Sequence, residues 1–387
     1  MSVVARRLAH VPPTVFSEMS ALAVRTGALN LGQGFPVVDG PASVIAAAEH
    51  ALESGANQYA PGIGVPALRA AIARHQQRHY GLAVDPDREV VVTTGCTEAI
   101  AAALLGLVDP GDEVVVLEPY YDSYVAMLDV CGAVRRPVTL RAPDFRPDPD
   151  DLRAAVTDRT KAILLNTPHN PTGTVLTRDE LQVIADLAIA HDVVVITDEV
   201  YEHLVFDGLS HVPIATLPGM WERTLTLSSA GKSWSFTGWK VGWATGPAPL
   251  VQALLAAKQW LTFTSGSPLQ PAVAHALDHE PDWPRQLARD LRTRRDLLCD
   301  GLAAAGLAPR LPEGTYFATT DISHLGWADG REFCLALPER AGVVAIPTQG
   351  FYDDPDAGRQ LVRWAFCKEP DVIEDGLRRL REAVLEK

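Results

Sequence analysis

The sequence predicts an α/β protein with a mostly parallel sheet covered by helices. Short apolar, β-branched runs alternate with longer amphipathic segments along the middle of the chain. These runs are almost continuously apolar, which is typical of strands buried on both faces. Strand–helix alternation indicates βαβ units and therefore parallel strands. With 387 residues, 47% of them hydrophobic, the chain can form a large domain and a smaller one.

Local sequence signals predict the helices and strands of the large domain. Helix 66–80 is expected because Pro66 opens it and Gly81 follows it. A second helix begins at Thr177, where Glu180 completes a capping box. Around these helices we expect five strands, at 89–94, 113–118, 161–166, 192–197 and 224–228.

The pattern changes near residue 280. A long charged helix at 284–305 precedes shorter strand segments, and an amphipathic segment ends the chain. We therefore predict a large domain at 36–280 and a small α+β domain formed by 1–35 together with 281–387. The expected elements after the long helix are strands near 315–320, 343–347 and 361–367 and a helix at 371–385.

Composition excludes several classes of protein. The net charge of −14 argues against a general partner for nucleic acid or anionic membranes. The five cysteines are scattered without metal-ligand spacing, so we expect no metal site and a reducing compartment. The longest apolar stretch, 99–108, is too short to cross a bilayer. No targeting segment is recognisable, and we expect a soluble, cytoplasmic protein.

Polar side chains follow four of the predicted strands, where ligands of parallel α/β sheets bind. Gly95, Cys96 and Thr97 open a helix after the first strand, and such an N-terminus suits a phosphate. Asn170 lies between prolines in a turn after the third strand. Alone, each has an ordinary structural explanation: a helix start, or an Asn-Pro turn.

The two remaining strand ends carry ionisable groups. Asp198 and Tyr201 leave the fourth strand together, where a helix cap and a packed aromatic would be the ordinary interpretation. Ser229 and Lys232 follow the fifth strand, with Lys240 eight residues further on. A lysine here would usually be a solvated loop charge. Together, however, four strand ends supply an anion site, an amide, an Asp/Tyr pair and a lysine.

This combination resembles the class I/II aminotransferases, which are fold-type I pyridoxal phosphate (PLP) enzymes. The matching motifs are NTPHNPTG at 166–173, DEVY at 198–201 and the segment 228–240 with its two lysines. The resemblance covers nearly the whole chain, from Asn30 to Trp364. It implies a large domain with a mostly parallel seven-stranded sheet between helices, a smaller α+β domain, and PLP as the cofactor.

The resemblance also implies roles for residues around the cofactor ring. Lys232 would join the cofactor as a Schiff base and later act as the base that moves the substrate proton. Asp198 would keep the pyridine nitrogen protonated. Tyr201 and Asn170 would bind the phenolic oxygen, and Tyr121 would stack on the ring.

The phosphate of the cofactor would lie in the turn at 95–97. Backbone N–H groups of that turn, the Ser229 hydroxyl and Lys240 are its expected partners. Tyr59 matches a residue that the family donates to the phosphate across a dimer interface. A homodimer with shared active sites follows from this match.

The substrate contacts are implied in the same way. Arg363 would bind the α-carboxylate through two parallel hydrogen bonds, with Asn170 beside it. Gly34 matches the position whose backbone closes over that carboxylate. Phe16 stands where related enzymes often have Trp, at the pocket for the substrate side chain.

Aspartate-type members of the family carry Arg at the position of Lys240. Members of the kynurenine/glutamine-type branch carry Lys there, as this chain does. The stretches 14–23, 37–41 and 198–206 make the chain look most like the branch of actinobacterial N-succinyldiaminopimelate aminotransferases and of methionine/glutamine/kynurenine aminotransferases. We expect amino transfer between an L-amino acid and a 2-oxo acid, with glutamate and 2-oxoglutarate as the second pair. N-succinyl-L,L-diaminopimelate is the leading substrate.

Three alternatives remain beside that assignment. One is a broad methionine, glutamine or kynurenine (aromatic) aminotransferase. Another is a cysteine-conjugate C–S β-lyase, which shares every cofactor residue and differs only after deprotonation at Cα. The third is a regulator that binds PLP and carries an attached DNA-binding domain. Because the aminotransferase-like fold is expected to begin by Asn30, this alternative is the least favoured.

Overall fold

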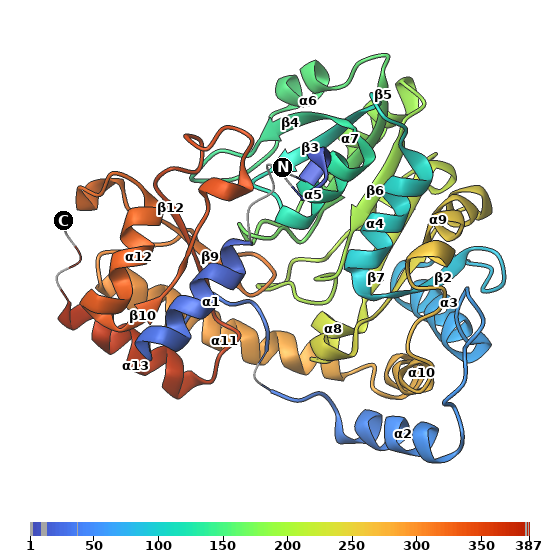
Figure 1. Ribbon diagram of the computed structural model, residues 1–387, viewed down its shortest axis with the longest axis horizontal. Coiled ribbons are helices and arrows are strands. Elements are labelled where there is room, and N and C mark those ends of the chain that lie inside the picture. The colour runs from blue at the N-terminus through green and yellow to red at the C-terminus, as the bar shows by residue number, and fades with distance from the viewer. Residues whose placement is uncertain (1–2, 9–13, 37, 384, 386) are drawn as a thin grey trace.

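The computed structural model describes residues 3–8, 14–36, 38–383, 385 and 387. Its elements form a large sheet with helices on both faces and, beside it, a smaller group of strands and helices that contains the C-terminal part of the chain (Figure 1). This arrangement confirms the predicted α/β class.

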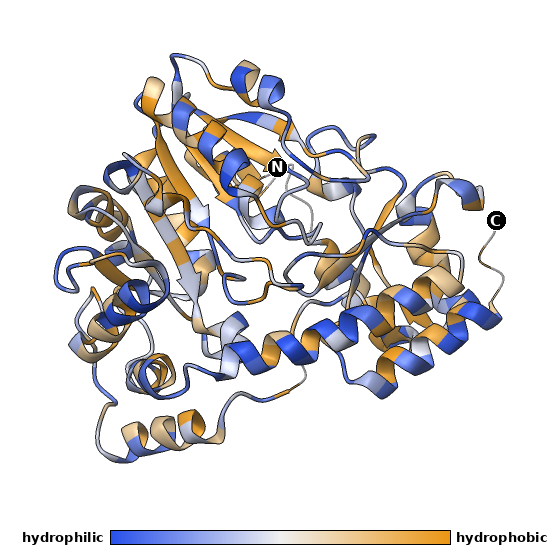
Figure 2. Ribbon diagram, turned by 180° about the vertical axis from the view of Figure 1, so that it is seen from behind, coloured by the Kyte–Doolittle hydropathy of each residue, from blue (hydrophilic) through white to orange (hydrophobic). Residues whose placement is uncertain are grey.

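The large sheet has seven strands in the order β2-β8-β7-β6-β5-β3-β4. β8 runs antiparallel to both of its neighbours, and the other pairs are parallel, which confirms a mostly parallel sheet. The strands are among the most hydrophobic ribbons of the chain (Figure 2). Their bounds are β2 Val90–Thr94, β3 Glu113–Glu118, β4 Val134–Thr139, β5 Thr160–Asn166, β6 Val194–Asp198, β7 Thr224–Ser229 and β8 Val241–Thr245.

Two of these strands were not predicted. β4 is an edge strand that contains Arg135, Arg136 and Pro137, so it lacks a continuous apolar run. Proline is tolerated at such an edge because no further strand needs its N–H. β8 is short and contains Gly242, a residue that weakens a strand pattern.

Side chains of successive residues in β2 face opposite layers. Val91 packs in one core cluster with α4, whereas Val90 and Val92 pack in another with α3 and α10. The sheet is therefore buried on both faces, as its apolar strands indicated. The helices around it are α2 Ala42–Glu53, α3 Pro66–Tyr80, α4 Gly95–Leu107, α5 Asp122–Cys131, α6 Pro149–Ala155, α7 Arg178–Ala190, α8 Ala230–Ser233, α9 Ala248–Leu261 and α10 Leu269–His279.

Two local predictions are confirmed in detail. α3 spans Pro66–Tyr80, and Gly81 follows it in the left-handed conformation, with φ of 71°. α7 begins with the predicted capping box, in which Thr177 accepts from the Glu180 N–H and Glu180 accepts from the Thr177 N–H.

The smaller group contains a three-stranded antiparallel sheet, in the order β11-β12-β9. A second, two-stranded sheet pairs β1 with β10 in parallel. α1 lies beside α12, so an N-terminal helix packs on the C-terminal group (Figure 1). The elements are α1 Val15–Thr26, β1 Leu29–Asn30, α11 Trp283–Ala304, β9 Phe317–Asp321, α12 Gly330–Ala341, β10 Val343–Val344, β11 Ile346–Pro347, β12 Leu361–Ala365 and α13 Pro370–Glu382.

The pairing of β1 with β10 supports the predicted union of residues 1–35 with 281–387, although that domain division stays a prediction. Residues 1–2 and 9–13 of the N-terminal segment lie outside the described part of the chain. Short 3-10 turns complete the fold at Arg6–Leu8, Ile214–Thr216, Trp221–Arg223, Thr237–Trp239, Ser323–Leu325 and Gln349–Phe351.

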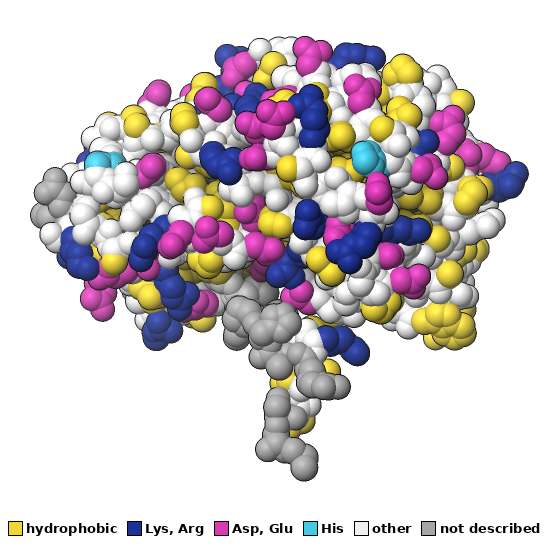
Figure 3. All heavy atoms as spheres, turned by 90° about the horizontal axis from the view of Figure 1, so that it is seen from above, with side chains coloured by type: hydrophobic (Ala, Val, Ile, Leu, Met, Phe, Trp, Pro, Cys, Tyr) yellow, Lys and Arg dark blue, Asp and Glu magenta, His cyan; other side chains and the backbone are white. Residues whose placement is uncertain are grey.

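The surface mixes charges of both signs. On the face shown in Figure 3, acidic and basic side chains are interspersed rather than gathered by sign. Among the described helices, none combines the length and the apolar character that crossing a bilayer requires.

Candidate active site

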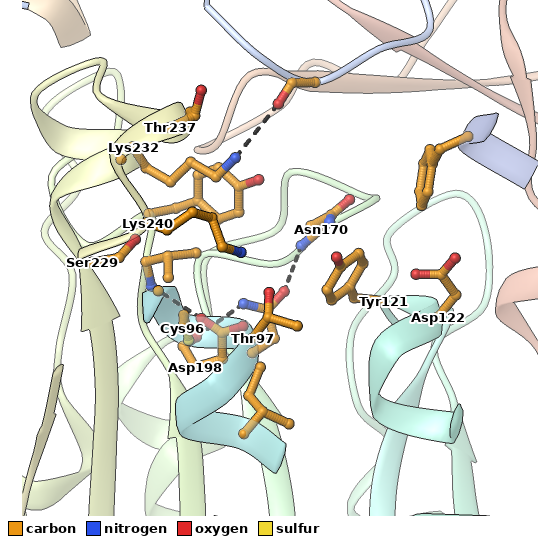
Figure 4. A pocket seen from close by; sticks show the side chains of 18 of the residues that line it. Cys96, Thr97, Tyr121, Asp122, Asn170, Asp198, Ser229, Lys232, Thr237 and Lys240 are labelled. Atoms are coloured by element: carbon orange, nitrogen blue, oxygen red, sulfur yellow. Dashed lines mark hydrogen bonds between the residues drawn. The ribbon is translucent and has the colours of Figure 1, made fainter. Parts of the chain in front are cut away.

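A cavity of ≈ 430 Å³ lies at the carboxyl ends of β2, β5, β6 and β7. Side chains enter it from several elements, with Lys232 and Lys240 on one side and Tyr121 on the other (Figure 4). Thirteen of the predicted site residues line it: Phe16, Gly34, Gly95, Cys96, Thr97, Tyr121, Asn170, Asp198, Tyr201, Ser229, Lys232, Lys240 and Arg363.

Tyr59 is the predicted site residue that does not line the cavity of this single chain. It lies between α2 and α3, 82% exposed, with its ring edge-on to that of Phe263 at 5.3 Å. An exposed position is what a residue donated to a second chain requires, but its predicted role stays untested.

One end of the cavity is formed by the start of α4. Gly95 turns the chain from β2 into this helix with φ of 72°, a conformation that favours glycine. A Cβ at Gly95 would lie 3.3 Å from the Lys240 Nζ, and one at Gly242 would lie 2.8 Å from the Cys96 nitrogen. The helix N-terminus, the ammonium and the nearby Ser229 hydroxyl therefore form a compact site for an anion.

Asp198 ends β6 and is buried at the bottom of the cavity. Burial raises the pKa of its carboxyl group, while hydrogen bonds from Tyr124 and Val200 favour the ionised form. The Tyr124 hydroxyl donates at 2.7 Å and the Val200 N–H at 3.2 Å. Asn166 fixes the strand end, because its amide donates to the Asp198 carbonyl at 2.9 Å. This carboxylate is thus held rigidly toward the cavity.

Lys232 lies on α8, directly after β7. Its amine donates to the Tyr316 hydroxyl at 2.7 Å and lies 3.5 Å from the Gly34 carbonyl oxygen. Tyr316 in turn donates to the same carbonyl at 2.5 Å. Burial lowers the pKa of Lys232 to about 8, against the opposing effects of Cys367 and Asp198. A lysine of this kind releases its proton far more readily than one in water.

Arg363 projects from β12 and is 2% exposed. Its guanidinium donates to the Asn170 side-chain oxygen at 3.0 Å and to the Gly32 carbonyl at 2.9 Å. The rings of Phe317 and Phe16 lie 4.0 and 4.8 Å from the guanidinium carbon.

The charge of Arg363 is not balanced by an ion pair within the described chain, and its Nε–H lacks a hydrogen-bond partner there. Burial lowers its pKa to about 10, so it stays charged at neutral pH. A buried cation with free donors is costly unless an anion joins it. A ligand carboxylate in the cavity fits this requirement.

Sequence reasoning missed two phenols of the site. Tyr316 directly precedes β9, and its contact with Lys232 depends on how the two sheets meet, which no local pattern shows. Tyr124 follows Tyr121 by three residues, and this helical spacing was a usable signal. Their rings meet edge-on with centroids 5.6 Å apart.

The fold and the cavity define a class of enzyme. A model of the aminotransferase class I and II family matches residues 26–379, and the chain belongs to this family. It is therefore an aminotransferase, as the motifs indicated, and enzymes of this family generally use PLP.

The chain is most informatively compared with individual aminotransferases of the family. The chain is 53% identical over 386 residues to the "Probable N-succinyldiaminopimelate aminotransferase DapC" of Mycobacterium tuberculosis, covering 97% of each chain. It is 39% identical over 376 residues to the methionine aminotransferase of Escherichia coli, again covering 97% of each. The solved N-succinyldiaminopimelate aminotransferase from Mycobacterium tuberculosis superposes with a TM-score of 0.95, covering 98% of this chain and 99% of that one.

Proposed function

We propose that this enzyme is a PLP-dependent aminotransferase acting on N-succinyl-L,L-diaminopimelate, with the glutamate/2-oxoglutarate pair as its second substrate. The observation that carries the reaction type is the cavity in which Lys232, Asp198 and Arg363 meet. The choice of substrate rests on the 53% identity to the mycobacterial relative along nearly the whole chain. We further propose that it works as a cytoplasmic homodimer.

The donors and acceptors of the cavity fit PLP. The buried Asp198 carboxyl would pair with the ring nitrogen, the start of α4 would hold the phosphate, and Lys232, whose pKa is lowered, would join the aldehyde carbon. When bound, PLP supplies the electron sink that stabilises negative charge at the substrate Cα. Its proposed ligands are the 95–97 turn, Ser229, Lys240 and the partner's Tyr59 for the phosphate, Asp198 for the ring nitrogen, Tyr121 for the ring face, and Tyr201 and Asn170 for the phenolic oxygen.

Lys232 is the proposed general base. Its Nζ would accept the proton from the substrate Cα and return it, in a 1,3-shift, to the carbon on the other side of the substrate nitrogen. A pKa of about 8 leaves part of the amine neutral at neutral pH, which this step requires. Tyr316 and the Gly34 carbonyl orient the Nζ so that it reaches the proton from a fixed direction.

Arg363 is the proposed anchor of the α-carboxylate. Both the amino acid and the 2-oxo acid carry this group, so one guanidinium serves both half-reactions in turn. The stack against Phe317 and the hydrogen bond to Asn170 fix the guanidinium plane, and with it the orientation of the Cα–H bond. The Gly34 backbone lies beside the same end of the cavity.

A methionine-type activity is the second candidate. It is favoured by the 39% identity to the methionine aminotransferase and by an apolar wall where the substrate side chain would lie. Phe16 lines the cavity there and is backed by Phe351, on which it stacks with ring centroids 5.7 Å apart. An unbranched, uncharged side chain would pack well against these rings.

A half-reaction screen tests both candidates. The PLP-loaded enzyme is mixed with single amino acids, and conversion of the cofactor to its amine form is followed by absorbance. We expect a higher kcat/KM for N-succinyl-L,L-diaminopimelate than for methionine, glutamine or kynurenine. Equal or slower conversion refutes the leading substrate, and no conversion with any of them refutes the reaction. Release of pyruvate from an S-aryl cysteine without an oxo acid would indicate the β-lyase.

A further inference from the structure

Three histidines gather outside the active-site cavity. His75 and His79 stand one turn apart on α3, and His203 follows β6 in the chain. Their ring centroids lie 4.5 Å (His75–His79), 4.9 Å (His79–His203) and 5.0 Å (His75–His203) apart. The Nε2 atoms of His75 and His203 are 2.8 Å apart, and one ligand nitrogen from each of the three lies within 4.8 Å of the others.

Burial disfavours a positive charge on these three imidazoles. Burial lowers the pKa of His75 to about 3 and that of His203 to about 4, and it lowers the pKa of the half-exposed His79 as well. One of the two Nε2 atoms in the 2.8 Å His75–His203 hydrogen bond carries its proton, so binding a metal through both atoms requires that ring to carry the proton on Nδ1 instead. The Nδ1 of His75 is buried, and no group of the described chain pairs with it.

A buried carboxylate adjoins the cluster. Glu202, next to His203 in sequence, is 4% exposed and accepts hydrogen bonds from the hydroxyls of Tyr80 and of Ser228, the latter at 2.6 Å. These donors favour its ionised form. No ion pair within the described residues balances its charge. A cation held by the neighbouring histidines would do so, since buried charges are normally paired or coordinate metals.

We propose that His75, His79 and His203 bind one divalent transition-metal ion of the imidazole-preferring kind, for which Zn²⁺ is the probe. Imidazole nitrogens at 2.0–2.1 Å from a tetrahedral Zn²⁺ lie about 3.4 Å apart. Binding therefore requires the His75 and His203 nitrogens, 2.8 Å apart here, to separate slightly and the His79 side chain to turn toward them. A neighbouring cavity of ≈ 480 Å³, lined by His79 and His203, admits the ion and leaves room for water as the fourth ligand.

The proposal departs from the expectation of no metal site. That expectation considered spacing along the chain, whereas His203 joins the pair because the segment that follows β6 lies against α3. The spacing of His75 and His79 was the available signal, because residues four apart share a helix face. The rings of His75 and His203 also lie 6.3 and 6.0 Å from that of Trp234, two residues after Lys232. A bound ion would thus tie α3 to the segment behind the active site.

Calorimetric titration of the chelator-treated, PLP-loaded enzyme with ZnCl₂ tests the site. We expect one Zn²⁺ per chain, an affinity lowered on the order of 10–100-fold or more in His79→Gln and in His203→Gln, and a higher Tm with Zn²⁺ in the wild type only. Both variants change partly buried side chains, and their Tm without metal checks the fold.

His279→Gln is the matched control. His275 and His279 form a similar pair on α10, with ring centroids 4.7 Å apart, but no third ligand joins them within the described chain. Unchanged binding in His279→Gln supports the three-histidine site. Wild-type affinity in either His79→Gln or His203→Gln, an equal loss in the control, or no saturable binding by the wild type would each overturn the proposal.

Discussion

Replacing Arg363 by lysine should weaken both half-reactions by the same factor. Lysine keeps the positive charge but has no planar fork, so it cannot bind a carboxylate through two parallel hydrogen bonds. It also loses the stack on the Phe317 ring, 4.0 Å away, and the hydrogen bonds that hold the guanidinium at Asn170 and Gly32. The carboxylate would then be held less firmly and in a less defined orientation.

The size of this loss follows from the contacts removed. One hydrogen bond to a charged group contributes about 1.5–3 kcal/mol in a buried site. Since 1.4 kcal/mol corresponds to tenfold, kcat/KM should fall roughly 10–150-fold. The factor should be the same for the amino acid and for the 2-oxo acid, because both present the α-carboxylate to the one guanidinium.

Single-turnover absorbance measurements of each half-reaction provide the assay. Arg331→Lys is the control, because Arg331 carries a bidentate pair with Glu18 at 2.6 and 2.8 Å on the protein surface. We expect no change in kcat/KM for that variant. Wild-type rates in Arg363→Lys, or a loss confined to one half-reaction, would refute the role given to Arg363.

Three further predictions concern Lys232, the proposed phosphate site at the start of α4, and the contribution of Tyr59 from a partner chain. In the PLP-free protein, burial lowers the pKa of Lys232 from its ordinary 10.5 to about 8. The buried amine therefore destabilises the folded state fully below pH 8, and this destabilisation decreases as the pH rises to 10.5. The free energy of unfolding in urea, taken relative to Lys232→Met, should therefore increase by roughly 2–3 kcal/mol between pH 7.5 and 10.5, and a flat difference would contradict the lowered pKa. Gly242→Ala would place a Cβ 2.6 Å from the Gly95 carbonyl carbon, so it should cost about 1–3 kcal/mol of stability and weaken PLP retention, whereas Gly238→Ala, with no neighbouring atom within 4 Å, should do neither. Tyr59→Ala and Lys232→Ala chains, each defective alone, should regain activity when dissociated and reassembled together, and absence of recovery would exclude a shared site.

Local signals in the sequence predicted the parts of the fold that local chemistry determines. Apolar runs identify the buried strands, and Pro66, Gly81 and the Thr177 capping box define helix ends. The order β2-β8-β7-β6-β5-β3-β4 depends on pairings between distant segments, which no window of sequence contains. β4 and β8 were not predicted because a polar edge strand and a strand that contains glycine lack the continuous apolar pattern of a buried strand.

The residues of the candidate site likewise fall into those that the sequence could predict and those that depend on tertiary packing. Residues at strand ends, such as Asp198 and Lys232, could be expected to meet because parallel strands end at one edge of the sheet. Tyr316 reaches Lys232 from the segment just before β9, and this contact arises only when the two groups of elements pack together. The resemblance to the family supplied Arg363 but gave no indication of Tyr124, which bonds the buried Asp198.

The parallel pairing of Leu29 and Asn30 with Val343 and Val344 has a consequence for synthesis on the ribosome. At about 5–20 residues per second, the first strand waits on the order of 15–60 s for its partner to be made. During that interval the nascent N-terminal segment, including Phe16, has nothing to dock against in the small sheet. Nascent chains lacking the last fifth of the protein should therefore be open to proteases at this segment, however well the large sheet has already formed.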